Sequence, residues 1–454
     1  MSQLKAHVQR NLDLYLSRLY EYLRFPSVSA DPARRSDIAA CARWLADYLG
    51  ELLGEVEVND RFGLPVVRAA TKRDPAKPTV LLYGHYDVQP ARVEDGWRTP
   101  PFEPTLVDGR IIGRGAADNK GPLLTYLFGL ELAKRQGELP VNLIVLVEGE
   151  EESTGQALGR FIAANRSRLT AEAILNTDSG GLLPARPALT YGTRGIVYKQ
   201  IDLEGANQDL HSGAFGGLVP NPAEALVHLL GELAGSDGRI NIPELYDRVR
   251  PIDPDEHQQF LELEYDIEGL KTRFDLRELA GETEFLPVER LWCRPNLCIN
   301  GLVGGYTGEG SKTVLPSRAS AKFSVRIVPD QDPGEVSDLI DRRLNELADP
   351  GVKMTIRTLG LAEPYLGPRT GPLVEAARSA CREAGGVEPA TIREGGTIPI
   401  LRELEQAISP NILMLGFSRP DCGAHGPGEY YHLDDFALGI ETVALLIAKL
   451  GGLK

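Results

Sequence analysis

The stretch Val80-Leu81-Leu82-Tyr83-Gly84-His85 decides the fold, because a continuous apolar run that stops at polar residues is typical of a buried strand. Two more such runs follow along the chain, at 143–147 (LIVLV) and at 173–175 (AIL). Helical patterns alternate with them, the first at about 120–135. Strands that are apolar throughout and alternate with helices predict an α/β domain, with a mostly parallel sheet that carries helices on both faces.

Each of these three runs delivers polar side chains where it ends. His85 ends the first, Glu148 follows the second, and Asp178 comes shortly after the third. Open α/β sheets bind their ligands at the carboxyl ends of parallel strands. Ordinary loop composition would also place polar residues there, but three strands in a row ending in His, Glu or Asp make that interpretation weaker.

The region from about 194 to 360 has a different pattern, which predicts a smaller α+β domain of the βαββαβ type. Its elements are expected at Ile196–Leu203 (strand), Pro222–Leu233 (helix), Asn296–Val303 (strand), Ala319–Val328 (strand), Pro333–Leu347 (helix) and Val352–Thr358 (strand). A charged stretch at about 236–295 interrupts it, with one helix expected at Leu261–Arg273. We therefore expect an α/β domain formed by 1–193 and 359–454, with a second domain inserted at 194–358.

Composition narrows the class of protein. The 454 residues carry a formal net charge of −15, which argues against a nucleic acid or an anionic membrane as the main partner. The acidity is compatible with a site that concentrates divalent cations, or with nothing more than an acidic surface. No apolar run reaches the length of a membrane span, and the N-terminus reads as a helix with one apolar face (Val8, Leu12, Leu16, Leu19, Leu23).

Cysteine usage indicates the compartment. The five cysteines are scattered and form no CxxC pair: Cys41, Cys293, Cys298, Cys381 and Cys422. A disulfide framework or a thiolate zinc site is therefore not expected, and a reducing cytoplasm is the natural location.

The histidines suggest a metal site. Of only seven, His85, His211 and His425 lie in glycine-flanked turns beside other polar groups. A single loop histidine is usually structural, but three in such settings, with carboxylates at neighbouring strand ends, indicate metal binding. In GHYDVQP (84–90) the imidazole suits zinc or manganese, and Asp87 could accept its other ring N–H. The alternative is an ordinary turn histidine.

Carboxylates could complete this site. Asp118, in RGAADNKG (114–121), could bridge two cations or simply cap a helix. The run EGEEES (148–153) could supply one metal ligand and a neighbouring general base, or be a solvated acidic loop. Asp178 and His425 also follow apolar strands, and each alone would be read as a loop residue. Together these groups fit two divalent cations about 3.5–4 Å apart.

The second region adds groups that suit an anion. It contains Asp209-Leu210-His211-Ser212-Gly213 and, on an expected strand, Arg326. An arginine on a strand is often paired structurally, but here it could clamp a substrate carboxylate. The turn Gly395-Gly396-Thr397 could offer backbone N–H groups to an anion.

Five motifs, in this order, resemble the M20 family of metallopeptidases, above all its carnosinase-like and cytosolic dipeptidase branch. They are GHYDVQP (84–90), RGAADNKG (114–121), EGEEES (148–153), DLHSGAFGG (209–217) and CGAH (422–425). The similarity covers nearly the whole chain, and includes FPSVS (25–29), TYGTRG (190–195), FSVRIVP (323–329) and REGGTIP (393–399).

The resemblance implies a ligand set for two zinc or manganese ions. It assigns His85 and Asp178 to one metal, Glu152 and His425 to the other, Asp118 as the bridge between them and Asp87 as the residue that orients His85. Glu151 would be the general base. Because three glutamates are consecutive, a register shift to Glu150 as base and Glu151 as ligand remains open, although the spacing from Glu148-Gly149 favours the first assignment.

The resemblance also implies how substrate is held. His211 would stabilise the oxyanion, entering from the partner subunit in dimeric members, and the inserted domain would serve as lid and dimerisation domain of a homodimer. Arg326 would bind the substrate carboxylate, helped by Thr313, Gly396 and Thr397.

The expected activity is hydrolysis of the amide bond of dipeptides with a free C-terminal carboxylate, through a metal-bridging water and a glutamate base. Two alternatives stay open. Removal of an N-acyl or N-succinyl group from an amino acid would use the same metal residues. A binding protein that kept the fold and lost turnover is disfavoured, because every expected ligand position is filled.

Overall fold

The computed structural model describes residues 3–153, 155–182, 186–235, 237–263 and 265–453. The chain forms two compact units. The large unit comprises Met1–Tyr191, Gly367–Ile392 and Ile400–Lys454, and the inserted unit comprises Gly192–Leu366 and Arg393–Pro399. The inserted unit therefore extends past residue 358 and also takes in a short segment from much later in the chain.

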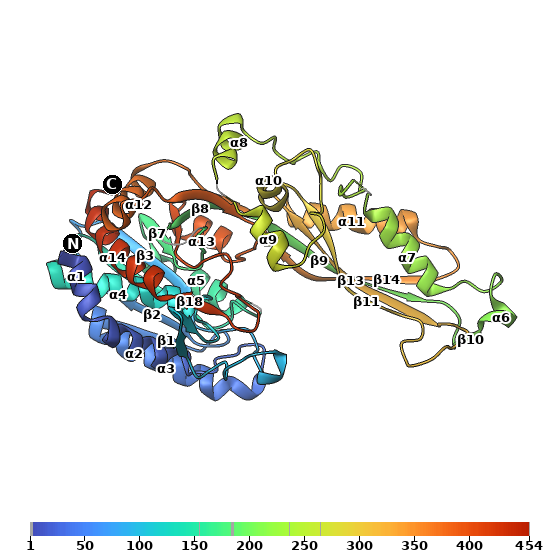
Figure 1. Ribbon diagram of the computed structural model, residues 1–454, viewed down its shortest axis with the longest axis horizontal. Helices are drawn as coiled ribbons and strands as arrows, with labels where there is room; N and C mark the ends of the chain where they lie inside the picture. The colour runs from blue at the N-terminus through green and yellow to red at the C-terminus, as the bar shows by residue number, and fades with distance from the viewer. Residues whose placement is uncertain (1–2, 154, 183–185, 236, 264, 454) are drawn as a thin grey trace. The chain divides into compact units, whose positions relative to one another are not determined.

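The large unit is built on a nine-stranded sheet (Figure 1). Its four central strands are parallel, in the order β6 (Asn142–Glu148), β3 (Thr79–His85), β7 (Ala173–Asn176) and β17 (Ile412–Gly416). Antiparallel strands flank them: β2 (Val66–Ala70) and β1 (Glu55–Asn59) at one edge, then β8 (Ala188–Thr193) and β15 (Tyr365–Leu366), the last residues of the first inserted segment, at the other. Strand β16 (Ala390–Glu394) also pairs with β8. The predicted mostly parallel sheet is thus confirmed at its centre.

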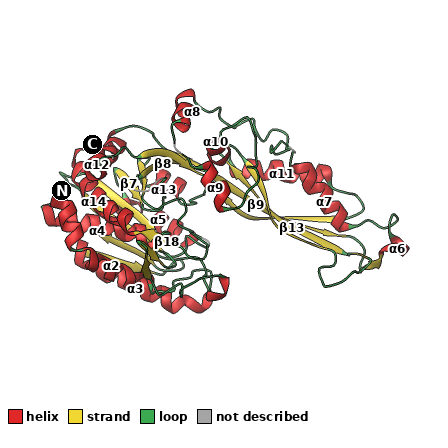
Figure 2. Ribbon diagram, in the orientation of Figure 1, coloured by secondary structure: helices red, strands yellow, loops and turns green. Residues whose placement is uncertain are grey.

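Helices cover this sheet, and every residue of β3 and β6 is buried. One apolar cluster joins alternate strand residues, such as Val80 and Leu82, to six helices: α1 (Gln3–Arg10), α2 (Leu12–Leu23), α3 (Arg35–Leu53), α4 (Lys120–Gln136), α12 (Pro372–Gly385) and α14 (Leu433–Lys449). Helix α5 (Gln156–Leu169) contacts β2, β6 and α13 (Leu401–Ala407). Its buried Phe161 and Ile162 lie outside that cluster, as expected for a helix on the opposite face (Figure 2).

The N-terminal helix is broken where the sequence predicts one continuous element. Asn11 has a non-helical backbone (φ −108°, ψ 9°) and separates α1 from α2. Its side-chain amide donates a hydrogen bond to the His7 carbonyl oxygen at 2.9 Å. Asparagine offers the backbone such local alternatives to helical bonding, which apolar periodicity does not register. Among the described residues no helix has the length and apolar character needed to cross a bilayer.

The inserted unit has the predicted βαββαβ order. Its antiparallel sheet runs β11 (Asn296–Gly304), β13 (Arg318–Ile327), β9 (Gly195–Glu204) and β14 (Lys353–Ala362). Helices α7 (Pro222–Leu233) and α11 (Pro333–Leu347) pack with β9 and β13 in one apolar cluster. Buried and half-buried residues alternate strictly along β9, so one face of the sheet carries these helices and the other does not.

The charged segment that interrupts this domain is more ordered than its sequence suggests. It contains α8 (Pro254–Leu261), α9 (Ile267–Arg273) and α10 (Pro287–Trp292). The predicted helix at Leu261–Arg273 is wrong at its start, because Leu261 ends α8, and the Asp266 side chain accepts the Gly269 N–H at 2.7 Å and so begins α9 there.

Small elements complete both units. A three-stranded sheet in the large unit joins β18 (Tyr430–His432), β5 (Arg110–Ile112) and β4 (Thr105–Val107). In the inserted unit β10 (Leu210–His211) pairs with β12 (Val314–Leu315), and the single-turn α6 (Ser212–Phe215) follows β10.

Candidate metal centre

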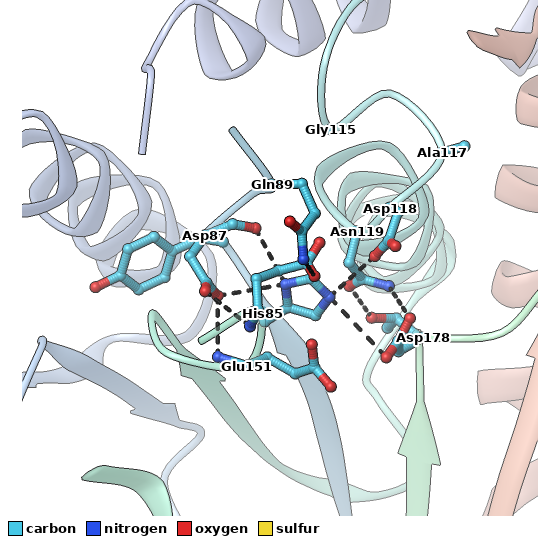
Figure 3. A network of polar contacts seen from close by, with 12 residues as sticks. His85, Asp87, Gln89, Gly115, Ala117, Asp118, Asn119, Glu151 and Asp178 are labelled. Carbon is cyan, nitrogen blue, oxygen red and sulfur yellow. Dashed lines mark hydrogen bonds and ion pairs between the residues drawn. The ribbon is translucent and has the colours of Figure 1, made fainter. Parts of the chain in front are cut away.

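His85 ends strand β3 with its ring completely buried (Figure 3). Its Nδ1 lies 3.1 Å from the backbone carbonyl oxygen of Asp87 and 3.4 Å from that residue's Oδ1. Since a carbonyl oxygen can only accept, Nδ1 carries the proton of that bond. Its Nε2 then faces two carboxylates, at 3.2 Å from Asp118 Oδ1 and 4.0 Å from Asp178 Oδ2. This is the orientation that a metal-binding imidazole needs.

Asp118 lies between two imidazoles. Its Oδ1 faces His85, and its Oδ2 lies 3.0 Å from His425 Nε2. The same His425 nitrogen is 3.3 Å from Glu152 Oε2. Two groups of three side chains, His85–Asp118–Asp178 and Asp118–Glu152–His425, therefore bring their donor atoms within 4.8 Å of one another. Asp118 belongs to both groups and offers one oxygen to each.

The electrostatics of this cluster favour positive charge. Burial lowers the pKa of His85, but the carboxylates of Asp118 and Asp87 outweigh it and raise that pKa well above its ordinary value. Contacts with Asp118 and Glu152 raise the pKa of His425 to about 10. Within the described residues, the buried Nε2 of His85 has no partner with hydrogen-bond geometry. Oxygen and imidazole donors around such an atom fit a divalent cation such as zinc or manganese.

Asp87 holds two parts of the site together. Besides its contacts with His85, its fully buried carboxylate accepts the backbone N–H of Glu151 at 3.3 Å and that of Glu152 at 3.0 Å. The sequence anticipates only the contact with His85. The structure adds a second effect, because the same carboxylate fixes the loop that carries the two glutamates.

The three consecutive glutamates point in different directions. Glu152 accepts a hydrogen bond from Gln89 Nε2 at 2.7 Å and faces His425. Glu150 is used elsewhere, since its oxygens accept the backbone N–H groups of Leu64 (2.8 Å) and Ala157 (3.0 Å). This geometry supports Glu151 and Glu152, and not Glu150 and Glu151, as the pair at the site.

Glu151 lies beside His85 in Figure 3. Burial raises the pKa of its carboxyl group well above the ordinary value, and the neighbouring carboxylates of Asp178, Glu152 and Asp118 add to the effect, while His85 opposes it. A carboxyl group whose pKa is raised in this way binds a proton more readily than a free carboxyl group, which suits a group that first takes and then returns a proton.

Sequence reasoning missed Glu429, the residue just before β18. Its fully buried carboxylate accepts four hydrogen bonds: from Arg114 Nη1 (2.6 Å) and from the backbone N–H groups of Gly115 (3.1 Å), Ala117 (2.8 Å) and Asp118 (3.0 Å). These bonds fix the loop that carries Asp118. Only the proximity of Glu429 to His425 in the sequence could have drawn attention to it, because its partners lie more than 300 positions earlier.

The inserted unit keeps its predicted residues in two separate groups. His211 is exposed on β10, where its Nδ1 accepts the Gly213 N–H at 3.0 Å, and the Thr313 carbonyl oxygen accepts the neighbouring Ser212 N–H. Arg326, near the end of β13, donates to Thr397 Oγ1 at 2.6 Å.

Strand β13 separates these groups. Its first residue, Arg318, directly follows Ser317, whose N–H is bonded to Asp209 beside β10. Arg326 lies eight residues further along β13, which is about 26 Å at the rise of an extended strand. The inserted unit of one chain therefore does not bring His211 and Thr313 together with Arg326, Gly396 and Thr397.

Comparison with known proteins agrees with this geometry. The model of peptidase family M20/M25/M40 matches residues 81–449. The chain belongs to this family. Across the full length of this M20 peptidase, 32% of residues are identical to Cys-Gly metallodipeptidase dug1 of Schizosaccharomyces pombe, 99% of which is covered. The Beta-Ala-His dipeptidase of Rattus norvegicus is likewise 32% identical, over 100% of this chain and 96% of the rat protein.

A solved structure shares the whole architecture. The M20 family metallo-carboxypeptidase Sso-CP2 from Sulfolobus solfataricus is 31% identical, with a TM-score of 0.87 over 96% of this chain and 99% of that one. The family and the fold expected from the sequence are thereby confirmed.

The substitution Glu429→Gln tests whether the hydrogen bonds of Glu429 hold the Asp118 loop of this M20 peptidase in place. An amide has one accepting oxygen, so its NH₂ group would face donors where a carboxylate oxygen now accepts. We expect zinc or manganese affinity to fall about 10- to 100-fold, as is usual when the support of a ligand is removed. Isothermal titration calorimetry on metal-free protein measures this. Glu138→Gln, at a side chain that is 85% exposed, is the control, and equal affinities in both variants would contradict the role of Glu429.

Proposed function

We propose that this M20 peptidase hydrolyses dipeptides that carry a free C-terminal carboxylate. The observation that carries the proposal is the shared Asp118 carboxylate, with one oxygen in each of two ligand groups and Glu151 beside them. The names of the two curated relatives, both dipeptidases that match over the full chain, support the substrate class.

We propose two divalent cations per chain, zinc or manganese. His85 and Asp178 would hold one, Glu152 and His425 the other, and Asp118 both. The mixture of imidazole and carboxylate donors supports these metals over calcium or an iron–sulfur cluster. Bound there, the cations would supply a water of lowered pKa and polarise the scissile carbonyl group.

The side chains of the protein would handle the protons. Glu151 would take one from the attacking water and return it to the leaving amine, and its raised pKa supports this double task. Asp87 would keep Glu151 in place through the backbone N–H that it accepts. An imidazole N–H of His211 would donate to the oxyanion of the tetrahedral intermediate.

The alternatives differ in substrate or in turnover. Removal of an N-acyl or N-succinyl group breaks the same type of bond and would use the same metal residues, so the dipeptidase names of the relatives decide our preference. A protein that only binds its ligand is disfavoured, because two groups of side chains that could hold metals, with a half-buried glutamate beside them, are what a catalytic site needs.

A metal-dependent substrate screen tests the activity. After chelation we expect no hydrolysis, and after addition of zinc or manganese we expect dipeptides to be cleaved faster than tripeptides or N-acyl amino acids. Glu151→Gln should lower kcat by about 10²- to 10⁴-fold while metals still bind, because the base is lost and the ligands remain. Glu138→Gln, the same substitution at an exposed side chain, is the control and should keep most of the activity. Faster turnover of N-acyl amino acids would favour the deacylase, and a full rate in Glu151→Gln would refute the base.

We further propose that Arg326 binds the substrate carboxylate, with Thr397, Gly396 and Thr313 contributing. No carboxylate in the described part of the chain lies within ion-pair distance of Arg326, whose bond to Thr397 is to a neutral hydroxyl. Burial lowers the pKa of this guanidinium, so a bound anion would be favoured there.

Arg326→Gln should raise KM for a dipeptide by about 10- to 100-fold, with a smaller effect on kcat, because a charge-assisted contact is lost. The same dipeptide with a C-terminal amide separates charge recognition from a general disturbance. It should be a poor substrate of the unmodified enzyme and should lose little further in the variant. An equal loss for acid and amide would contradict the assignment.

We propose a homodimer in which His211 and Thr313 act in the partner's site. A dipeptide spans about 7 Å, far less than the separation along β13 between these residues and Arg326, so one inserted unit cannot offer both groups to one substrate. The edge strand β11 also exposes Ile299, Leu302 and Val303, at 49%, 57% and 67% of their surface. An exposed apolar edge is typical of an association surface.

Complementation between two inactive variants tests this arrangement. His211→Ala lacks the oxyanion residue and Glu151→Gln lacks the base. If His211 acts in the partner's site, each mixed dimer has one intact site, and an equal mixture that exchanges subunits should recover about a quarter of the unmodified activity. If His211 acts within its own chain, the mixture stays inactive. The variants incubated separately are the controls.

We also propose a reducing, cytoplasmic location. Its support is that the structure leaves all five cysteines unpaired as disulfides, four of them buried. Neither a nucleic acid nor a membrane surface is proposed as a partner, in keeping with the net charge of −15.

A further inference from the structure

The inserted unit contains a cavity of about 450 Å³ that none of the roles above uses. It is lined by the residues that directly follow α7, by the segment with α9 and α10, and by the start of β11. Its walls are mainly apolar, with Ile240, Ile267, Leu270, Leu279, Leu291 and Leu297 among the lining residues. The volume lies within the range of about 300–1,000 Å³ that is usual for small-molecule sites.

A buried cation lines this apolar space. Arg194 is only 6% exposed, and its side chain donates to the Gly395 carbonyl oxygen at 2.9 Å and to Asn296 Oδ1 at 2.6 Å. Both acceptors are neutral, and no carboxylate of the described residues lies within ion-pair distance of it. Burial and the nearby charge of Arg326 lower the pKa of Arg194 to about 10, so it is still a cation at neutral pH.

The other charged groups of the cavity add no free negative charge. Arg239 faces Glu282 at 3.4 Å and is thereby balanced. Arg290 donates only to the backbone carbonyl oxygens of Phe285, Ala280 and Thr283. Among the residues that the structure describes, no aspartate or glutamate lines the cavity. The cavity therefore has apolar walls and a positive charge. Together these two properties favour a ligand that is apolar and carries a negative charge.

We propose that this cavity binds an apolar monocarboxylate, such as a medium-chain or aryl-alkyl acid, whose carboxylate pairs with Arg194. The acid would satisfy a guanidinium that has only neutral partners, and its hydrocarbon part would cover the leucine and isoleucine side chains. The site is distinct from the proposed substrate clamp, by which we mean Arg326 and Thr397 at the substrate carboxylate. Neither of these two residues lines the cavity.

Binding of an acid in the cavity would affect the substrate clamp through Arg194. The backbone N–H of Arg194 donates to the Gly396 carbonyl oxygen at 3.0 Å, and its side chain holds Gly395. An acid bound to Arg194 would therefore act on the turn that positions Thr397. This second effect rests on the proposed function, whereas the binding of the acid does not.

Calorimetric titration of the full-length protein with octanoate tests the binding. We expect one site per chain, with octanamide at least about tenfold weaker because it lacks the charge. Arg194→Gln should weaken octanoate to the level of the amide. Leu270→Trp should abolish binding by filling the cavity, while Leu261→Trp, at a 53% exposed position outside the lining, should leave it unchanged.

Arg326→Gln separates this site from the substrate clamp. It should retain octanoate binding even if it impairs hydrolysis, so the two proposals can fail independently. The proposal is overturned if octanoate does not bind, if octanamide binds equally well, or if Arg326→Gln and not Leu270→Trp removes the binding. Leu270→Trp keeps the test decisive if Arg194→Gln fails to fold.

Discussion

Carboxylates gather at one edge of a buried sheet in the large unit, and the repulsion among them is the main constraint on its structure. The buried imidazole of His85 is surrounded by the carboxylates of Asp87, Asp118, Glu151 and Asp178, while Glu152 faces His425. The carboxylate of Asp87 is completely shielded from water. Uncompensated charges in such a place would cost several kcal/mol each. The cluster therefore has to be offset by fixed donors in the chain and by positive charge at its centre.

Backbone amides supply much of that compensation. Asp87 accepts the N–H groups of two consecutive glutamates, and Glu429 accepts three N–H groups and one guanidinium around the Asp118 loop. Each buried carboxylate thus stabilises the loop that carries a different acidic residue. Because the donors belong to the backbone, they impose a shape on the loop and leave the side chains of Asp118, Glu151 and Glu152 free to face the centre of the site.

This arrangement explains what the sequence reveals and what it hides. The ends of β3 and β7 were predictable, since an apolar run that stops at His85 or just before Asp178 marks both a strand and its polar end. Asp118 and Glu152 could be assigned because they lie in short motifs that resemble a known family. Glu429 was not predictable from pattern, because its importance lies in four donors contributed by a distant loop.

The predicted helix boundaries were wrong for a related reason. Asn11 and Asp266 break or begin helices through hydrogen bonds of single side chains, which leave no trace in apolar periodicity. For the charged segment at about 236–295 the sequence predicted one helix, Leu261–Arg273, because its apolar positions are few. In the structure, buried ion pairs organise it: Arg393 bonds Glu256 through two of its nitrogens, and Arg294 does the same with Glu282. Charge patterning does not reveal which of many charged residues pair in this way.

The same segment shows why a stretch without obvious chemistry can still shape a site. Its ion pair with Arg393 anchors the short return segment Arg393–Pro399, which carries Gly395, Gly396 and Thr397, to the inserted unit. Most guanidiniums in the segment have carboxylate partners, but Arg194 and Arg326 at the neighbouring end of the sheet have only neutral ones. Burial, together with the nearby charge of Arg326, lowers the pKa of Arg194 to about 10, which reflects the cost of holding a cation there. Positive charge with only neutral partners favours anions, so the charge at this end of the inserted sheet is opposite in sign to that of the acidic centre in the large unit.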